Sequence, residues 1–333
     1  MEDPVSVTAI RPEELLKALS GLWTELGKEE VEGSDRSAGV LRAVTMTFIL
    51  GVEEGEEEGA GETLAQLMHE HPSRAIVIKL RKNGSDVVEG RAYAQCWMPF
   101  GRRQQICCEQ IELSAGAKNL EDVASVLRGL IAPDLPVVFW CRSARLFEQK
   151  AYGLIAGMAD KVIVDTRGLE DPQAGVRFVA QQLKLGRLYG DLTWTRLTRW
   201  RETIAHVFER IDCKEFLGSM ERVVVKYTQT PEPMAVVYLK GWLRTVMGAG
   251  VKIESERCES EGSWQIREVR FESRGRDVVI DRVEKGIVES HIDSFRTRSV
   301  FEILDEARLV REELAILERD PIFARTIEVI GKS

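Results

Sequence analysis

Apolar, β-branched runs alternate with amphipathic segments through most of the first 190 residues, and this alternation restricts the fold more than any other feature. The amphipathic segments, such as residues 119–131, carry apolar side chains at about 3.6-residue spacing, the repeat of a helix with one buried face. Strands that alternate with helices form layered domains with a mostly parallel sheet. We therefore predict an α/β fold there, with buried strands in the runs VLRAVTMTFILGV, AIVIKL, VVFWC and KVIVDT.

The pattern changes in the second half of the chain. Residues 250–293 are charged, punctuated by glycine and β-like, which suits an antiparallel sheet with one face in water. Helices are expected over 299–318 and directly after Asp320-Pro321. We therefore predict two domains, an N-terminal α/β domain over 1–210 and a smaller α+β domain over 211–333.

Composition and missing motifs argue against several classes of protein. The formal net charge of −8 disfavours nucleic-acid binding, which depends on neutralising phosphates with Lys and Arg. No apolar stretch approaches the roughly 18 residues of a transmembrane helix, and the N-terminus lacks a secretory signal, so we expect a cytoplasmic protein with no membrane partner. No GxGxxG follows the first strand, and no GxxxxGK[ST], GxSxG or HExxH occurs. We therefore expect no cofactor and no catalytic residues.

Histidine and cysteine spacing gives no reason to expect a metal. His69 and His71 lie between a predicted helix and a strand, without an acidic or thiol partner at a useful spacing. The six cysteines include no CxxC pair, and in a cytosolic protein we expect them to be reduced and mostly buried. Strand alternation should point Cys107 and Cys108 to opposite faces of a sheet.

The most unusual segment is GDLTWTRLTRWR at residues 190–201. It is expected to open a helix over 193–210, with Asp191 or Thr193 as the N-cap. At about 100° per residue, one helical face carries apolar side chains from 197 to 208, and the opposite face is polar. We select six candidate residues for binding a partner or an anion: Asp191, Trp194, Arg196, Arg199, Trp200 and Arg201.

Three interpretations of this segment remain open. Its tryptophans could be core residues with the arginines on a solvated face. A helix start carries free N–H groups that attract anions, so the arginines could complete a phosphate or carboxylate site. Arginine beside tryptophan is also typical of the residues that dominate protein interfaces. A seventh candidate, Arg74 at the start of a predicted strand, could assist anion binding.

Several segments, read together, resemble the glucose-6-phosphate dehydrogenase assembly protein family, OpcA. The resemblance runs from about residue 40 to 325, and GDLTWTRLTRWR is its most specific element. The other segments, in chain order, are EHPSRAIVI, QQICCEQI, PDLPVVFW, VIVDT, YLKGWL and REELAILERDPIF. Cys141 follows Trp140 where some relatives have a second tryptophan, so no shared role is carried to that position.

This resemblance implies a non-catalytic protein that binds glucose-6-phosphate dehydrogenase and promotes its active oligomer or its activity, at the start of the oxidative pentose phosphate pathway. An alternative from another class is an α/β enzyme or sensor that binds a sugar phosphate or nucleotide through Arg74, Arg196 or Arg199. The positions that the resemblance marks as functional or structural are His71, Pro72, Ser73, Arg74, Glu109, Gln110, Asp191, Trp194, Thr195, Arg196, Leu197, Thr198 and Trp200.

Overall fold

The computed structural model of the chain forms two compact units, Met1–Val164 and Asp165–Ser333. This division falls earlier than the domain boundary at 210 that the sequence suggests, and it makes the units nearly equal in length. Each unit is described by itself. The structure describes residues 5–8, 11–32, 40–82, 87–97, 105–209, 214–248, 250–274, 276–292 and 294–332.

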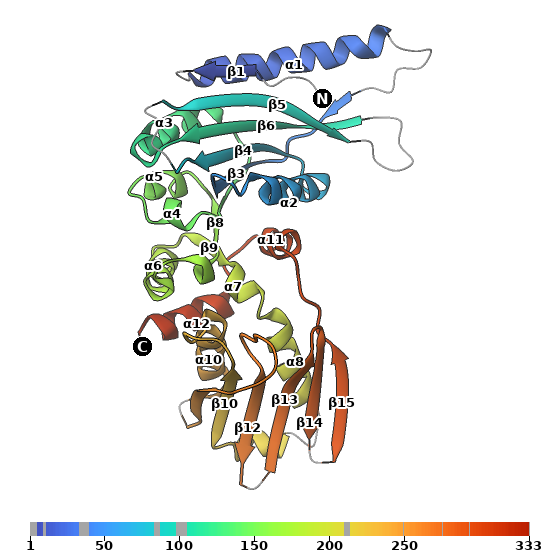
Figure 1. Ribbon diagram of the computed structural model, residues 1–333, viewed down its shortest axis with the longest axis vertical. Coiled ribbons are helices and arrows are strands. Elements are labelled where there is room, and N and C mark those ends of the chain that lie inside the picture. The colour runs from blue at the N-terminus through green and yellow to red at the C-terminus, as the bar shows by residue number, and fades with distance from the viewer. Residues whose placement is uncertain are drawn as a thin grey trace. The chain divides into compact units, whose positions relative to one another are not determined.

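The first unit is built on a mostly parallel sheet, which confirms the predicted α/β class (Figure 1). Strand β5 (Glu89–Trp97) runs antiparallel to β6 (Gln105–Ala115), and β1 (Val5–Thr8) is antiparallel to β5. Strand β2 (Val40–Arg42) pairs in parallel with β6. The strand order is β1 (Val5–Thr8), β5 (Glu89–Trp97), β6 (Gln105–Ala115), β4 (Ser73–Leu80), β3 (Met46–Glu53), β7 (Val137–Cys141) and β8 (Lys161–Val164).

The central strands of this sheet are apolar because helices cover them. Right-handed crossovers put α2 (Glu57–Glu70), between β3 and β4, and α3 (Leu120–Leu130), between β6 and β7, on opposite faces. Helix α1 (Pro12–Glu32) and α5 (Tyr152–Ala156) pack beside α3. The helix predicted over 144–157 is instead divided into α4 (Ala144–Phe147) and α5, with turns between them.

The second unit contains a six-stranded sheet in which β10 and β11 are parallel and the remaining pairs are antiparallel. Along β12 and β13 buried residues alternate with charged ones, so one face is apolar and the other is lined by ion pairs. The predicted sheet with one wet face is therefore confirmed. The order is β11 (Lys252–Arg257), β10 (Arg222–Tyr227), β12 (Glu268–Ser273), β13 (Arg276–Glu284), β14 (Ile287–Ile292) and β15 (Phe295–Val300).

Helices of this unit pack on one another as well as on the sheet. Helix α10 (Met234–Met247) packs against α12 (Pro321–Gly331), and α12 against α6 (Pro172–Lys184). A Cβ at Gly241 of α10 would overlap Ile330 of α12, so the close approach of the two helices needs glycine there. The helices are α6 (Pro172–Lys184), α7 (Leu192–Thr195), α8 (Thr198–Phe208), α9 (Lys214–Gly218), α10 (Met234–Met247), α11 (Glu306–Ala315) and α12 (Pro321–Gly331), with strand β9 (Leu188–Asp191) between α6 and α7.

The prediction of a helix over 299–318 is wrong at its start. Ser299 and Val300 belong to β15, and α11 begins only at Glu306. The cause is local, because Asp305 accepts a hydrogen bond from the backbone N–H of Arg308 at 2.8 Å and so caps the helix at that point. Among the helices that the structure describes, none has the length and apolar character needed to cross a bilayer.

Candidate functional site

The single helix predicted over 193–210 is divided into two helices in the structure, α7 (Leu192–Thr195) and α8 (Thr198–Phe208), and the segment 190–201 contains the first and the start of the second. Asp191 caps the first, α7, and its side chain accepts from the N–H of Thr193 at 2.8 Å, which confirms it as an N-cap. The N–H of Leu197 then bonds to the Trp194 carbonyl at 3.0 Å, three residues back. Such a bond tightens the turn and ends α7, and α8 starts afresh at Thr198.

Asp191 is enclosed in the second unit and has no exposed surface. Its Oδ2 accepts from the Tyr238 hydroxyl at 2.5 Å, and its Oδ1 accepts from the N–H groups of Thr193 and Thr166. Burial raises the pKa of Asp191 to about 6, and the nearby Asp165 carboxylate adds repulsion. Burial also raises the pKa of Tyr238 well above its ordinary value. This pair joins α10 to the start of α7.

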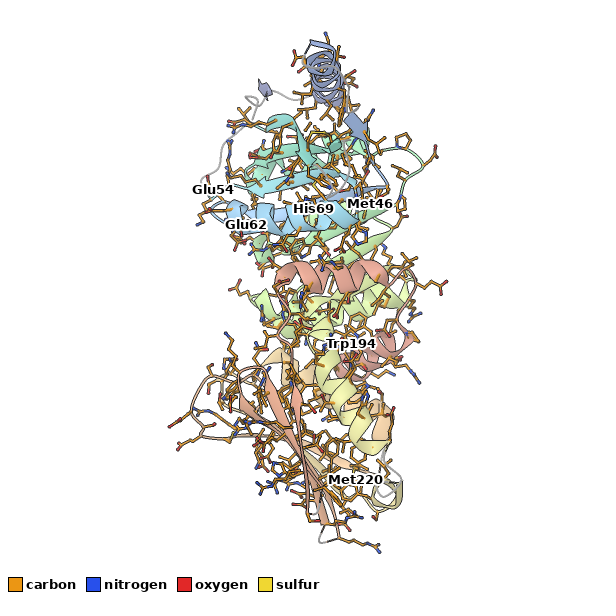
Figure 2. The ribbon with its side chains drawn as sticks, turned by 90° about the vertical axis from the view of Figure 1, so that its right-hand side faces the viewer. Met46, Glu54, Glu62, His69, Trp194 and Met220 are labelled. Atoms are coloured by element: carbon orange, nitrogen blue, oxygen red, sulfur yellow. A yellow bond between two sulfur atoms is a disulfide. The ribbon has the colours of Figure 1, made fainter. Side chains whose placement is uncertain are left out.

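Trp194 is an interior residue of the second unit, among its helices in Figure 2. Its Nε1 donates to Asp320 Oδ2 at 3.0 Å, and Asp320 also caps α12. The Arg201 guanidinium lies 3.4 Å from the centre of the Trp194 ring. Burial lowers the pKa of Arg201 to about 10. Trp194 therefore connects α7 to α8 and α12 rather than facing a ligand.

The apolar face predicted for α8 is confirmed. Leu197, Trp200 and Ile204 are at most 3% exposed. The Trp200 ring lies 5.2 Å from that of Phe301, which follows β15. Trp200 is thus a core residue, as in the first of the three interpretations.

Three candidates of this segment, Arg196, Arg199 and Trp200, line a cavity. The cavity lies within the second unit and has a volume of about 660 Å³. Arg196 pairs with Asp165 at 2.8 Å, and Arg199 pairs with Glu202 at 2.7 Å. The structure therefore separates the six candidates. Asp191, Trp194 and Arg201 lie in the interior, Arg196 and Arg199 lie at the cavity, and Trp200 is buried but also lines the cavity.

Arg74 lies in the first unit, apart from the other candidates in the chain. Its Nε donates to Glu109 at 2.5 Å and its Nη1 donates to the Leu130 carbonyl at 2.7 Å. Glu109 is fully buried and also accepts from Arg42 and Trp23. Arg74 borders a cavity of about 410 Å³, but its donors already meet a buried carboxylate. This arrangement is typical of a structural ion pair.

The expectation that the cysteines are reduced is wrong for two of them. Cys96 and Cys107 are bonded to each other, because the β5–β6 register places them directly opposite with Cα atoms 4.0 Å apart. Cys108 points to the other face and is free and buried, so the expectation for the 107–108 pair holds. The ring of His69 (labelled in Figure 2) lies 4.9 Å from that of Trp97, centre to centre, and is tilted by 42° against it. Within the described ranges, no group of three or more His, Cys, Asp or Glu side chains could hold a metal.

Sequence reasoning missed the partners of the 190–201 segment. Glu313 is 3% exposed and accepts from the Thr195 hydroxyl at 2.6 Å. A Cβ at Gly190 would overlap the Glu313 carboxylate, which explains why glycine begins the segment. Glu313 and Asp320 both lie in the segment REELAILERDPIF, and Tyr238 begins YLKGWL. The resemblance of those two segments to the family could have pointed to these partners, although the sequence alone does not show which residues pair.

Two family models match consecutive parts of the chain. The model that describes the N-terminal domain of a glucose-6-phosphate dehydrogenase subunit matches residues 65–181. The model that describes the C-terminal domain of the same kind of protein matches residues 188–327. Together these matches include Arg74, Glu109 and the whole 190–201 segment.

Curated relatives include cyanobacterial proteins named for the OxPP cycle, OpcA. The Synechocystis sp. protein is 27% identical over 191 residues, which are 56% of this chain and 39% of that protein. The Synechococcus elongatus protein is 24% identical over 203 residues, 61% of this chain and 45% of that protein. The chain thus matches less than half the length of either relative.

Solved structures with a similar arrangement include biliverdin reductase of Synechocystis sp. and a levoglucosan dehydrogenase. The first has 9% identity and a TM-score of 0.45, over 86% of this chain and 97% of that one. The second has 9% identity and a TM-score of 0.47, over 85% of this chain and 90% of that one. Likeness at this level carries no conclusion about activity.

Proposed function

Because the chain belongs to the glucose-6-phosphate dehydrogenase assembly protein family, we propose that it is a non-catalytic protein that binds this dehydrogenase and promotes its active oligomer. The observation that carries the proposal is the match of both family domains, in order, over 65–181 and 188–327. The role belongs to the OxPP cycle, after which the cyanobacterial relatives are named. We expect it to act in the cytoplasm.

Among the described residues, the carboxyl group whose pKa burial raises most supports a non-catalytic role. Asp191 has a pKa raised to about 6 by burial, a value that would suit a general acid or base. Its carboxylate is nevertheless enclosed and held by Tyr238, Thr193 and Thr166, so no substrate proton can reach it. Asp191, whose pKa would suit proton transfer, therefore has a structural role in joining α7 to α10.

Promotion of an oligomer needs only preferential binding. A protein that binds the active oligomer, and not its separate subunits, stabilises the oligomer by about 2.7 kcal/mol when present at a hundred times its dissociation constant. No catalytic group in the assembly protein is required for such a shift.

We propose that the dehydrogenase contacts the edge strand β15 of the second unit. All six residues of β15 are exposed, including Phe295 at 59% and Val300 at 89%. An exposed edge offers unpaired backbone groups to a second chain, and apolar side chains beside it add affinity. The buried members of the 190–201 segment then support this unit from within, instead of touching the partner.

The test is a dehydrogenase assay with and without this protein, paired with native mass spectrometry of the mixture. The proposal requires a complex of the two proteins and a larger fraction of active oligomer. Failure to detect a complex, together with an unchanged rate, would remove it.

A further inference from the structure

The cavity lined by Arg196 and Arg199 is rich in basic side chains. Arg167, Arg282 and Lys285 also line it, and the acidic lining residues are Glu302 and Glu306. Arg167 and Arg196 share Asp165, and Arg199 pairs with Glu202, so Arg282 and Lys285 are the lining cations without a carboxylate partner among the described residues. A volume of about 660 Å³ is that of a small-molecule pocket.

Arg282 occupies a position in this cavity where the sheet pattern calls for an apolar residue. Along β13, Val278 and Ile280 are buried, and alternation puts Arg282 on the same, helix-covered face. Its guanidinium lies 5.1 Å from the centre of the Trp264 ring and 4.6 Å from that of Phe301. Two aromatic rings therefore hold the guanidinium in place and remove part of its hydration.

Arg282 also lacks an anionic partner among the described residues. Its Nε is buried and donates no hydrogen bond there, and no carboxylate of the described ranges lies within ion-pair distance. The two neighbouring arginines differ, because Arg196 is paired with Asp165 and Arg199 with Glu202. A partly desolvated cation without a counter-charge is unfavourable by itself, and an anion in the cavity would remove that penalty.

We propose that this cavity binds a small phosphorylated molecule and that Arg282 is the residue that receives its phosphate group. A guanidinium donates two parallel hydrogen bonds to phosphate, and the two lining cations without a carboxylate partner, Arg282 and Lys285, match a doubly charged phosphate ester better than a single carboxylate. The rings of Trp200, Trp264 and Phe301 supply an apolar wall for the rest of the molecule. The cavity size favours a small ligand over an acidic segment of a protein.

The proposal is tested by calorimetric titration of the full chain alone at low salt, with inorganic phosphate, glucose 6-phosphate and neutral glucose as probes. We expect the two phosphates to bind and glucose not to bind. Arg282→Gln should weaken phosphate binding roughly tenfold or more, because it removes a charge-assisted hydrogen-bond donor. Arg298→Gln is the matched control: Arg298 is 55% exposed and pairs with Glu289, so it should bind phosphate as the unaltered protein does.

A second readout distinguishes a built site from general charge attraction. Arg282→Gln removes an unpaired cation, so its melting temperature without ligand should equal or exceed that of the unaltered protein. Added glucose 6-phosphate should raise the melting temperature of the unaltered protein and leave that of the variant unchanged. If Arg282→Gln does not fold, Lys285→Gln at an exposed lining position takes its place and should weaken binding severalfold.

Two results would overturn the proposal. The first is no phosphate binding at millimolar concentrations, and the second is equal phosphate binding by Arg282→Gln and the unaltered protein. Because the dehydrogenase is absent from the titrations, their failure leaves the assembly proposal untouched.

Discussion

Tyr238 donates its hydroxyl to Asp191 across 2.5 Å, and neither side chain reaches solvent. Tyr238 comes from the first half of α10, and Asp191 both ends β9 and caps α7. The bond therefore joins the longest described helix of the second unit to the segment that most resembles the assembly protein family. Its acceptor is a carboxylate that burial makes harder to ionise.

Asp191 should make the protein less stable as the pH rises from about 4 to about 6. Its pKa is raised from 3.8 to about 6 in the folded chain. In that window the unfolded chain has lost this proton and the folded chain still holds it, so rising pH favours unfolding. A difference of about two pKa units corresponds to up to about 3 kcal/mol, present below pH 4 and lost above pH 6.

The measurement is urea denaturation of the unaltered protein and of Asp191→Asn from pH 4 to 7. Asparagine is a good N-cap and does not ionise, so the variant isolates the titration from the cap. The free energy of unfolding of the variant minus that of the unaltered protein should rise across this window. A difference that stays constant with pH would contradict the account.

Asp320→Ala should destabilise the protein by about 2–4 kcal/mol, because it removes two interactions at once. The carboxylate caps α12, which is typically worth about 1 kcal/mol. It also accepts from Trp194, and a buried indole N–H without a partner costs about 1–3 kcal/mol. Asp305→Ala is the control, because it removes only the cap of α11 and should cost about 1 kcal/mol. Equal losses would mean that the Trp194 bond contributes nothing.

Trp200→Ala should lower the stability of the protein much more than Arg199→Ala, because Trp200 is a core residue of the 190–201 segment and Arg199 is a surface residue. Truncating a tryptophan that is 3% exposed costs about 3–5 kcal/mol. Arg199 makes a half-exposed ion pair with Glu202, so its loss should change stability by less than about 1 kcal/mol. Thermal unfolding of the two variants provides the comparison. A Trp200→Ala protein of unaltered stability would return this residue to the list of surface candidates.

Val300→Lys should weaken association with the dehydrogenase roughly tenfold or more while leaving stability unchanged, since Val300 is 89% exposed on β15. Lysine on an edge strand opposes pairing with another chain. Leu317→Lys provides a matched control, because Leu317 is also apolar and 82% exposed but lies after α11. Affinities measured by biolayer interferometry should differ between the two variants. Equal affinities would place the contact away from β15.

Features that depend on local pattern could be predicted from the sequence. The central strands β3 and β7 are almost wholly buried, so their apolar runs indicated a parallel sheet. The N-cap Asp191 and the apolar face of α8 follow from residues within two turns of each other. The structure of such a segment can be predicted from its own residues, without knowing which distant residues pack against it.

Features that depend on distant pairing could not be predicted. Trp194 and Asp320 are 126 positions apart, and a single sequence gives no reason to join them. The Cys96–Cys107 bond depends on the register between β5 and β6. A slip of one residue would turn the side chains of the slipped strand to the other face of the sheet. In the sequence Arg282 does not differ from an ordinary strand arginine, and only the fold brings Trp264 and Phe301 beside it.

Titration of the cognate glucose-6-phosphate dehydrogenase with this protein, followed by its specific activity and oligomeric state, tests the assembly role most directly. We expect a complex of the two proteins by native mass spectrometry, and an active-oligomer fraction and a rate that rise together and saturate. No complex at any ratio, with an oligomer distribution and a rate that do not change, would contradict it.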